Sequence, residues 1–199
     1  MSETIVRNIH WNERLEKYLA ETGEKAHCYS WLNKKAEELF SNRSIFIDLP
    51  VIILGVFNGA TSIGSTTLFS NTQLASIIIG IIALLTSLLT TVGTYFAFAR
   101  RAESHKMIGI QYAKLYRFIN VELNLPRTER TNPDLFLKYV KEQYDRLAEI
   151  SPLIPKSIIF DFNSHFNKPE YKNISKPEIT NGIHSIQIFP LNSIEIEVK

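Results

Sequence analysis

The residue types that carry most protein chemistry are sparse in this chain and widely spaced. The five histidines and the single cysteine, Cys28, show no metal-ligand spacing, and one cysteine excludes an intrachain disulfide. The sequence contains no GxxxxGK[S/T], GxGxxG, HExxH or GxSxG motif, so phosphate-loop, dinucleotide, metalloprotease and serine-hydrolase chemistry have no support. We therefore expect no enzyme, no cofactor and no metal site.

One carboxylate stands apart because of its surroundings. Asp48 is the only Asp, Glu, Lys or Arg between Ser44 and Ala99. An acidic side chain inside an apolar segment is costly unless it lies at a membrane interface or finds a partner. The simpler interpretation places Asp48 among lipid headgroups or pairs it with Arg100 or Arg101. The alternative is a ring of Asp48 side chains at a cation-selective vestibule of an oligomer.

Small and hydroxylated residues form a second pattern in the same region. They recur at spacings of three and four, which places them on one stripe of a helix; the stripe includes Ser87, Thr90 and Thr94. Gly55 and Gly59 form a GxxxG motif, with Asn58 beside it. Either these stripes pack two helices of one chain against each other, or several chains assemble and one stripe faces a water-filled centre.

Two apolar segments must position these residues. They cover about residues 45–64 and 74–99, or 20 and 26 residues. As helices they would measure roughly 30 and 39 Å, against a bilayer core of about 30 Å. The first segment is marginal because it carries Asp48 and Pro50, and a buried helix of a soluble protein is its alternative. The pattern predicts a mainly α, membrane fold with a two-transmembrane helical hairpin in the lipid bilayer.

The placement of positive charge predicts the orientation of the hairpin. The link at residues 65–73 has no charge, whereas Arg43 precedes the hairpin and Arg100 and Arg101 follow it. Basic residues on short flanks stay on the cytoplasmic side, so we expect both termini to be cytoplasmic, or internal to a virion, in a host or virion membrane. Anionic headgroups explain these basic residues better than nucleic acid does.

The flanks read as extended cytoplasmic helices. Residues 1–24 form an amphipathic helical segment that we expect to break near Gly23, and a second helix then runs into the first span. After the hairpin the helix is expected to continue through Arg100 to Leu123 and to end at Leu125-Pro126. Its apolar stripe consists of His105, Ile108, Tyr112, Leu115, Ile119 and Leu123. Asn132-Pro133 supplies a cap and a first-turn proline for a further helix that stops before Pro152. These helices should pack as a small bundle.

The C-terminal tail has a different pattern. The chain divides into residues 1–24, a membrane domain at 25–158 and a tail at 159–199. Period-two alternation at residues 185–189 and 193–198 makes the tail β-prone, either as its own hairpin or as strands added to a partner's sheet. Residues 156–199 are therefore the candidate contact for a protein partner.

The arrangement of these segments resembles a known family. Its features are Trp31–Ala36 (WLNKKA) before the hairpin, Arg100–Lys106 (RRAESHK) after it, Gly109–Arg117 (GIQYAKLYR), Glu142–Leu147 (EQYDRL) and Ser151–Pro155 (SPLIP). Over about residues 31–158 the chain is similar to the SLATT family, two-transmembrane effector domains associated with nucleotide-based conflict systems and also found in large DNA viruses. The resemblance implies a homo-oligomer that forms a pore.

Three functions remain open on this basis. The first is a pore-forming or membrane-perturbing effector that self-associates. No nucleotide-sensing domain accompanies the hairpin, so such an effector would need a separate trigger. The second is a structural membrane anchor, such as a virion membrane protein that links a bilayer to a coat or scaffold through its tail. A small transporter or channel subunit is the third, and two spans would require it to multimerise.

Overall fold

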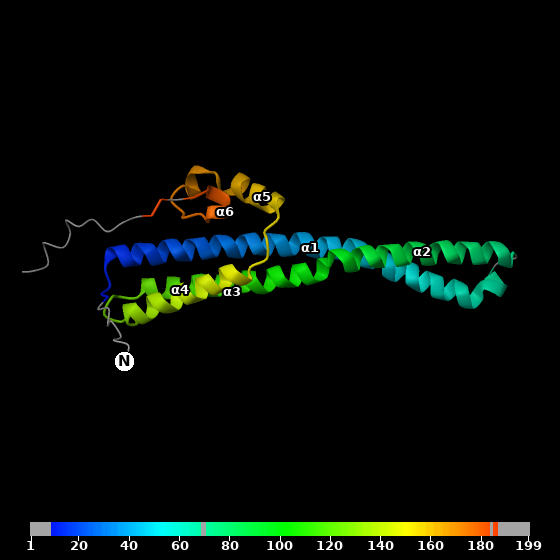
Figure 1. Ribbon diagram of the computed structural model, residues 1–199, viewed down its shortest axis with the longest axis horizontal. Helices are drawn as coiled ribbons and strands as arrows, with labels where there is room; N and C mark the ends of the chain where they lie inside the picture. The colour runs from blue at the N-terminus through cyan, green and yellow to red at the C-terminus, as the bar shows by residue number, and fades with distance from the viewer. Residues whose placement is uncertain (1–8, 69–70, 184, 187–199) are drawn as a thin grey trace, which may run out of the picture.

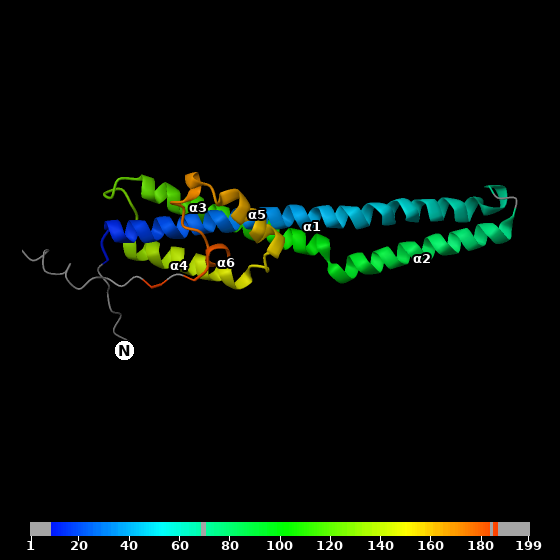
Figure 2. The ribbon, with the colours of Figure 1, turned by 90° about the horizontal axis from the view of Figure 1, so that it is seen from above.

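The computed structural model describes residues 9–68, 71–183 and 185–186, and these are almost entirely helical. They form α1 (Glu13–Leu68), α2 (Thr72–Phe96), α3 (Phe98–Asn124), α4 (Pro133–Ile150), α5 (Lys156–Phe166), a 3-10 turn at Pro169–Tyr171 and α6 (Glu178–Asn181). The molecule is elongated: α1 runs its full length, and α2 and α3 return along it (Figures 1 and 2). The part of the chain that the structure describes contains no strand.

Helix α1 is continuous where the sequence predicted a break. It passes through Gly23 without interruption and runs directly into the first apolar segment, as its second half was expected to do. Gly23 is explained by packing, because a Cβ at this position would lie 3.3 Å from Cγ2 of Ile119 on α3. Glycine therefore lets the two helices approach closely, at a modest cost in helix propensity.

The stalk, defined as residues 13–44 of α1 with α3 and α4, holds the main core. The apolar stripe predicted on α3 is buried at His105, Ile108, Tyr112, Leu115 and Ile119. Its members meet α1 through Leu19 and Ala26 and α4 through Phe136, Val140 and Leu147, which are also buried. The bundle expected from the three amphipathic flanks is therefore confirmed.

The end of α3 and the start of α4 lie where the sequence predicted them. Helix α3 stops at Asn124, just before Leu125-Pro126. Asn132 Oδ1 then accepts hydrogen bonds from the backbone N–H groups of Asp134 (3.0 Å) and Leu135 (3.4 Å), and Pro133 occupies the first turn of α4. Both predictions are confirmed, because capping and proline effects depend on neighbouring residues alone.

A second, smaller core forms where the sequence expected only a tail. Residues 156–166 form α5, which packs Ile158 and Phe162 against Leu32 and Ala36 of α1. The sequence did not predict this helix, although Ile158, Phe162 and Phe166 have the spacing of a helical face. Of the predicted strands, Ser185 and Ile186 are not in a strand, and residues 187–189 and 193–198 lie outside the described residues.

The apolar ends of α1 and α2 form a hairpin that projects from the stalk (Figure 1). Two helical stretches, Glu13–Gly64 and Gln73–Asn124, each contain a window long and apolar enough to cross a membrane, and only 6% of each window is buried. A core helix of a soluble protein would be mostly buried, so that alternative does not fit the first segment. The fold therefore has a packed stalk and an exposed apolar hairpin.

Candidate functional site: the hairpin and its hydroxyl face

The two arms of the hairpin meet along one line of each helix, here called the seam. On α2 the least exposed positions recur every three or four residues, from buried Ala75 to half-buried Gly93; on α1 they run from Ile47 to Thr61. The arms are close at Gly93, where a Cβ would lie 3.2 Å from Cγ2 of Ile47. The members of the seam are Ile47, Val51, Leu54, Asn58 and Thr61 on α1, and Ala75, Ile79, Ile82, Thr86, Leu89 and Gly93 on α2.

The predicted small-residue stripes do not form this seam. Gly55 and Gly59 are exposed, and a Cβ added at either would meet nothing within 4 Å. Ser87, Thr90 and Thr94 on α2 are exposed as well. Packing of the two spans of one chain against each other therefore does not account for Gly55, Gly59 or Ser87, whereas Thr90 and Thr94 border a cavity that α1 also lines. Of the residues predicted there, only Asn58 lies in the seam.

The two stripes instead share one side of the hairpin. Each member lies one residue after a seam position, which is a rotation of about 100° around its helix. Because the helices are antiparallel, the same rotation carries both stripes to the same side. We call this side the hydroxyl face; Ile52 is its one bulky member, and the others are Asp48, Gly55, Gly59 and Ser62 on α1, and Ser76, Gly80, Ala83, Ser87, Thr90 and Thr94 on α2.

The opposite side of the hairpin is bulky. Its positions lie one residue before the seam and include Phe46, Phe57, Ile81 and Leu88, which are 82%, 57%, 53% and 60% exposed. Large aliphatic and aromatic side chains of this kind suit contact with lipid chains, whereas small residues allow another backbone to approach closely. The hairpin therefore has two chemically different sides.

A cavity of about 370 Å³ lies where the hydroxyl face meets the stalk. Four of the residues singled out from the sequence line it: Asp48, Thr90, Thr94 and Arg100. Asp48 Oδ2 accepts a hydrogen bond from Ser44 Oγ at 2.6 Å. Among the described residues it forms no ion pair with Arg100 or Arg101, so the predicted pairing with either arginine is wrong.

The other two basic residues of this junction share one aromatic ring. The guanidinium groups of Arg43 and Arg101 lie 6.0 and 5.8 Å from the ring centre of buried Phe40. Arg43 comes from α1 and Arg101 from α3, so both cations are held at the boundary between stalk and hairpin. This is the level at which lipid headgroups would lie if the hairpin crossed a bilayer.

The junction also contains a break that the sequence did not predict. Helices α2 and α3 are separated at Ala97, which has left-handed backbone angles (φ 48°, ψ 45°) and donates its N–H to the Gly93 carbonyl. Figure 2 shows the change in direction between the two helices. Alanine in this conformation is disfavoured by roughly 1 kcal/mol or more, so surrounding contacts must hold it. The Phe96 and Phe98 rings stack across it at 5.3 Å.

One polar atom in the seam has no partner. Asn58 Oδ1 is buried and accepts no hydrogen bond, while the neighbouring Thr61 hydroxyl donates back to the carbonyls of Phe57 and Asn58. An unpaired amide oxygen costs free energy in an apolar surrounding.

In the part of the chain that the structure describes, no three His, Cys, Asp or Glu side chains come together as a metal site.

Comparison of the chain with family models, with curated proteins and with solved structures finds no match.

Proposed function

We propose that residues 45–96 insert into a membrane as a two-span hairpin, and that hairpins self-associate through the hydroxyl face into an oligomeric pore or membrane-perturbing effector. The observation that carries the proposal is the chemical difference between the two faces of the hairpin. Its small and hydroxylated residues gather on one face that is exposed in the part of the chain that the structure describes, while bulky side chains take the other.

Membrane insertion is supported by what the hairpin leaves exposed. Ile45, Phe46, Ile63 and Leu84 are 57–89% exposed, and they belong to two helices with mean hydropathies of 1.7 and 2.3 over the apolar window. A soluble protein rarely exposes apolar surface on this scale, because water would have to solvate it. The positions of Arg43, Arg100 and Arg101 support an orientation with both termini on the cytoplasmic or internal side.

Self-association is supported by how helices pack in lipid. Apolar side chains gain little from one another there, so association depends on close backbone approach at small residues and on interhelical hydrogen bonds. The hydroxyl face offers both, with glycines at 55, 59 and 80 and hydroxyl groups at 87, 90 and 94. Asp48 and Arg100 at its stalk end would then be repeated around the assembly, at the mouth of any central pore. The resemblance to the SLATT family supports the same function.

Two adjacent threonines provide a matched test. The Thr90 and Thr91 hydroxyls each donate to the carbonyl four residues earlier at 2.8 Å, but only Thr90 lies on the hydroxyl face. In liposomes, Thr90→Leu should abolish both the cross-linked oligomer and dye release. Thr91→Leu should leave both as in the unchanged chain, because its side chain points away from the proposed interface.

A monomeric hairpin that releases no dye, or equal effects of the two variants, would contradict the proposal. The first result would favour the structural anchor. Deletion of the whole tail would not test that anchor cleanly, because residues 156–176 contribute to the second core and to contacts with α1. Truncation after Ile183 keeps those contacts. Loss of a coat or scaffold partner in that variant would identify the removed residues, 184–199, as the anchor's binding segment.

A further inference from the structure

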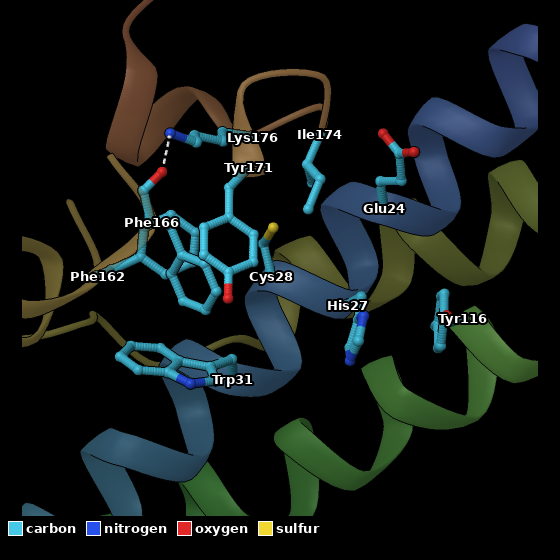
Figure 3. A pocket seen from close by; sticks show the side chains of 10 residues that line it. All are labelled: Glu24, His27, Cys28, Trp31, Tyr116, Phe162, Phe166, Tyr171, Ile174 and Lys176. Atoms are coloured by element: carbon cyan, nitrogen blue, oxygen red, sulfur yellow. Dashed lines mark hydrogen bonds between the residues drawn. The ribbon is translucent and has the colours of Figure 1, made fainter. Parts of the chain in front are cut away.

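A second cavity, of about 340 Å³, lies in the stalk, away from the hairpin. It is enclosed by α1, α3 and the segment from α5 to Lys176 (Figure 3). Helix α1 contributes Glu24, His27, Cys28 and Trp31, which lie at the spacing of one helical face. Sequence patterns did not group these residues as one site, because its α1 wall and its wall at residues 162–176 lie more than 130 residues apart in the chain.

Aromatic rings form two facing walls of the pocket. On one side, Trp31 and Tyr171 each pack edge-to-face with Phe166. Their ring centroids lie 5.3 and 4.9 Å from that of Phe166. On the other side, the His27 ring stacks on Tyr116 at 4.2 Å and turns its other face toward the cavity (Figure 3). The rings hold one another in place, so the walls are formed before any ligand arrives.

The charge at the pocket is arranged in favour of a cation. Glu24 lies at its edge, where Oε2 accepts the Ser175 N–H at 2.7 Å. Lys176 also borders the cavity, but its ammonium group donates to the Phe166 carbonyl at 2.7 Å and points away (Figure 3). Burial, together with the nearby Glu24 carboxylate, raises the pKa of the Cys28 thiol to about 11, and the Lys176 ammonium opposes this rise. Because the Lys176 ammonium is turned to the Phe166 carbonyl, the Glu24 carboxylate is the charge that a bound ligand would meet at the edge of the pocket.

We propose that the aromatic pocket binds a small organic cation, a methylated or quaternary ammonium group. Such a cation is attracted to the faces of aromatic rings and to a carboxylate, and it needs no hydrogen-bond acceptor for each of its substituents. An anion would be repelled by Glu24. This site is independent of the membrane function proposed above.

The ligand would join two parts of the chain. Trp31 and His27 belong to the long helix α1, whereas Phe166 and Tyr171 belong to the segment that follows α4. A molecule held between them stabilises the packing of that segment on the stalk, since binding to the folded state alone raises its stability. Occupancy is therefore expected to raise the melting temperature.

Choline and its uncharged analogue 3,3-dimethylbutan-1-ol test the proposal, because they share a shape and differ in charge. The full chain in a maltoside detergent, which has no ammonium group, is titrated with each by calorimetry. Trp11→Phe leaves Trp31 as the one tryptophan, so its fluorescence reports occupancy independently. We expect choline to bind in the millimolar range or tighter, and the alcohol to bind about tenfold more weakly.

Glu24→Gln should weaken choline binding by about tenfold while keeping an oxygen that can accept from Ser175. Glu21→Gln, on the preceding turn of α1 and outside the pocket, is the matched control and should leave the affinity unchanged. Equal affinity for the alcohol, choline binding that ignores Glu24→Gln, or no binding at millimolar choline would each overturn the proposal. So would acetate binding that is lost in Lys176→Gln.

Discussion

The stalk and the hairpin are built on the same long helix, yet they satisfy its apolar side chains in opposite ways. In the stalk, Leu19, Ala26 and Leu32 of α1 are fully buried. In the hairpin, Ala75 and Thr61 are the buried residues among those that the structure describes, and neither is large. Helix α1 therefore passes from a region where its apolar side chains are buried by the same chain to a region where they are exposed.

The kinds of contact differ as well. The stalk is held by aromatic stacks such as Tyr29 on Tyr112 at 5.0 Å, and by ion pairs such as Glu16 with Arg130. The hairpin arms touch only along the narrow seam, and their polar groups bond mainly to their own helix, as Thr86 does to the Ile82 carbonyl. The contrast indicates that the stalk determines the stability of the chain, whereas the hairpin surface is left exposed, as the proposed membrane function requires.

Removing a ring from each region should give the largest contrast. Phe136 is 2% exposed and its ring lies 5.8 Å from Trp11 and 5.2 Å from Phe118, so Phe136→Ala should cost about 3–5 kcal/mol in the free energy of unfolding. Phe46→Ala, at an 82% exposed position, should cost less than about 0.5 kcal/mol. Unfolding in detergent, followed by circular dichroism, measures both; similar losses would remove the distinction between the regions.

Glycine-to-alanine substitutions sharpen the comparison. At Gly109 a new Cβ would lie 3.3 Å from Asn33 Cβ and 3.5 Å from the Ser30 carbonyl, so α1 and α3 must separate at a cost of about 1–3 kcal/mol. Gly55→Ala meets nothing within 4 Å and should be neutral or slightly stabilising in a detergent monomer. Melting temperatures test both; destabilisation by Gly55→Ala would show that the arm is packed in the monomer.

An ion-pair cluster at the far end of the stalk should contribute less. Hydrogen bonds from Arg127 and Arg130, together with the charges of both guanidinium groups, lower the pKa of Glu16 from 4.5 to about 2. Glu16→Gln should cost about 1–2 kcal/mol at neutral pH, whereas Glu38→Gln, in an exposed pair with Lys35, should cost almost nothing.

The pH dependence of this cluster follows from the lowered pKa. The unfolded chain takes up the proton first, so the contribution of Glu16 is present above pH 4.5 and is lost as the pH falls toward about 2. Acid titration of unfolding free energies in the unchanged chain and in Glu16→Gln measures the difference. Parallel curves between pH 5 and pH 3 would contradict the assignment.

The smallest expected effect is the contribution of His105 to the pH dependence of the unfolding free energy near neutral pH. Its Nδ1 bonds to Asn33 Oδ1 at 2.8 Å, and because Asn33 Nδ2 already donates to the Tyr29 carbonyl, the histidine is the donor. Burial, with help from Arg101, lowers the pKa of His105 below 6.5. The unfolded chain therefore binds the proton first, and stability should decline as the pH falls below 6.5. His105→Gln should flatten the curve between pH 7 and pH 5.

The sequence alone determined the local features of this protein. The hairpin segments, the end of α3 before Pro126 and the start of α4 at Asn132-Pro133 all depend on composition, capping and proline chemistry within a few residues. The buried stripe of α3 was also predictable, because helical periodicity shows which residues share a face. The helix at 156–166 had such a signal in Ile158 and Phe162, which the surrounding prolines and asparagines obscured.

Only the tertiary structure decided which face meets which neighbour. Periodicity grouped Gly55 with Gly59 and Ser87 with Thr90, but a stripe looks the same in sequence whether it packs inside a hairpin or points outward. Gly23 continues the helix and serves its packing against Ile119, a contact that the sequence does not show. The break at Ala97 occurs at a residue that is neither glycine nor proline, so the sequence gives no signal for it. The hydroxyl face and the aromatic pocket exist because segments far apart in the sequence lie side by side in space. Local residue patterns do not show which distant segments become neighbours.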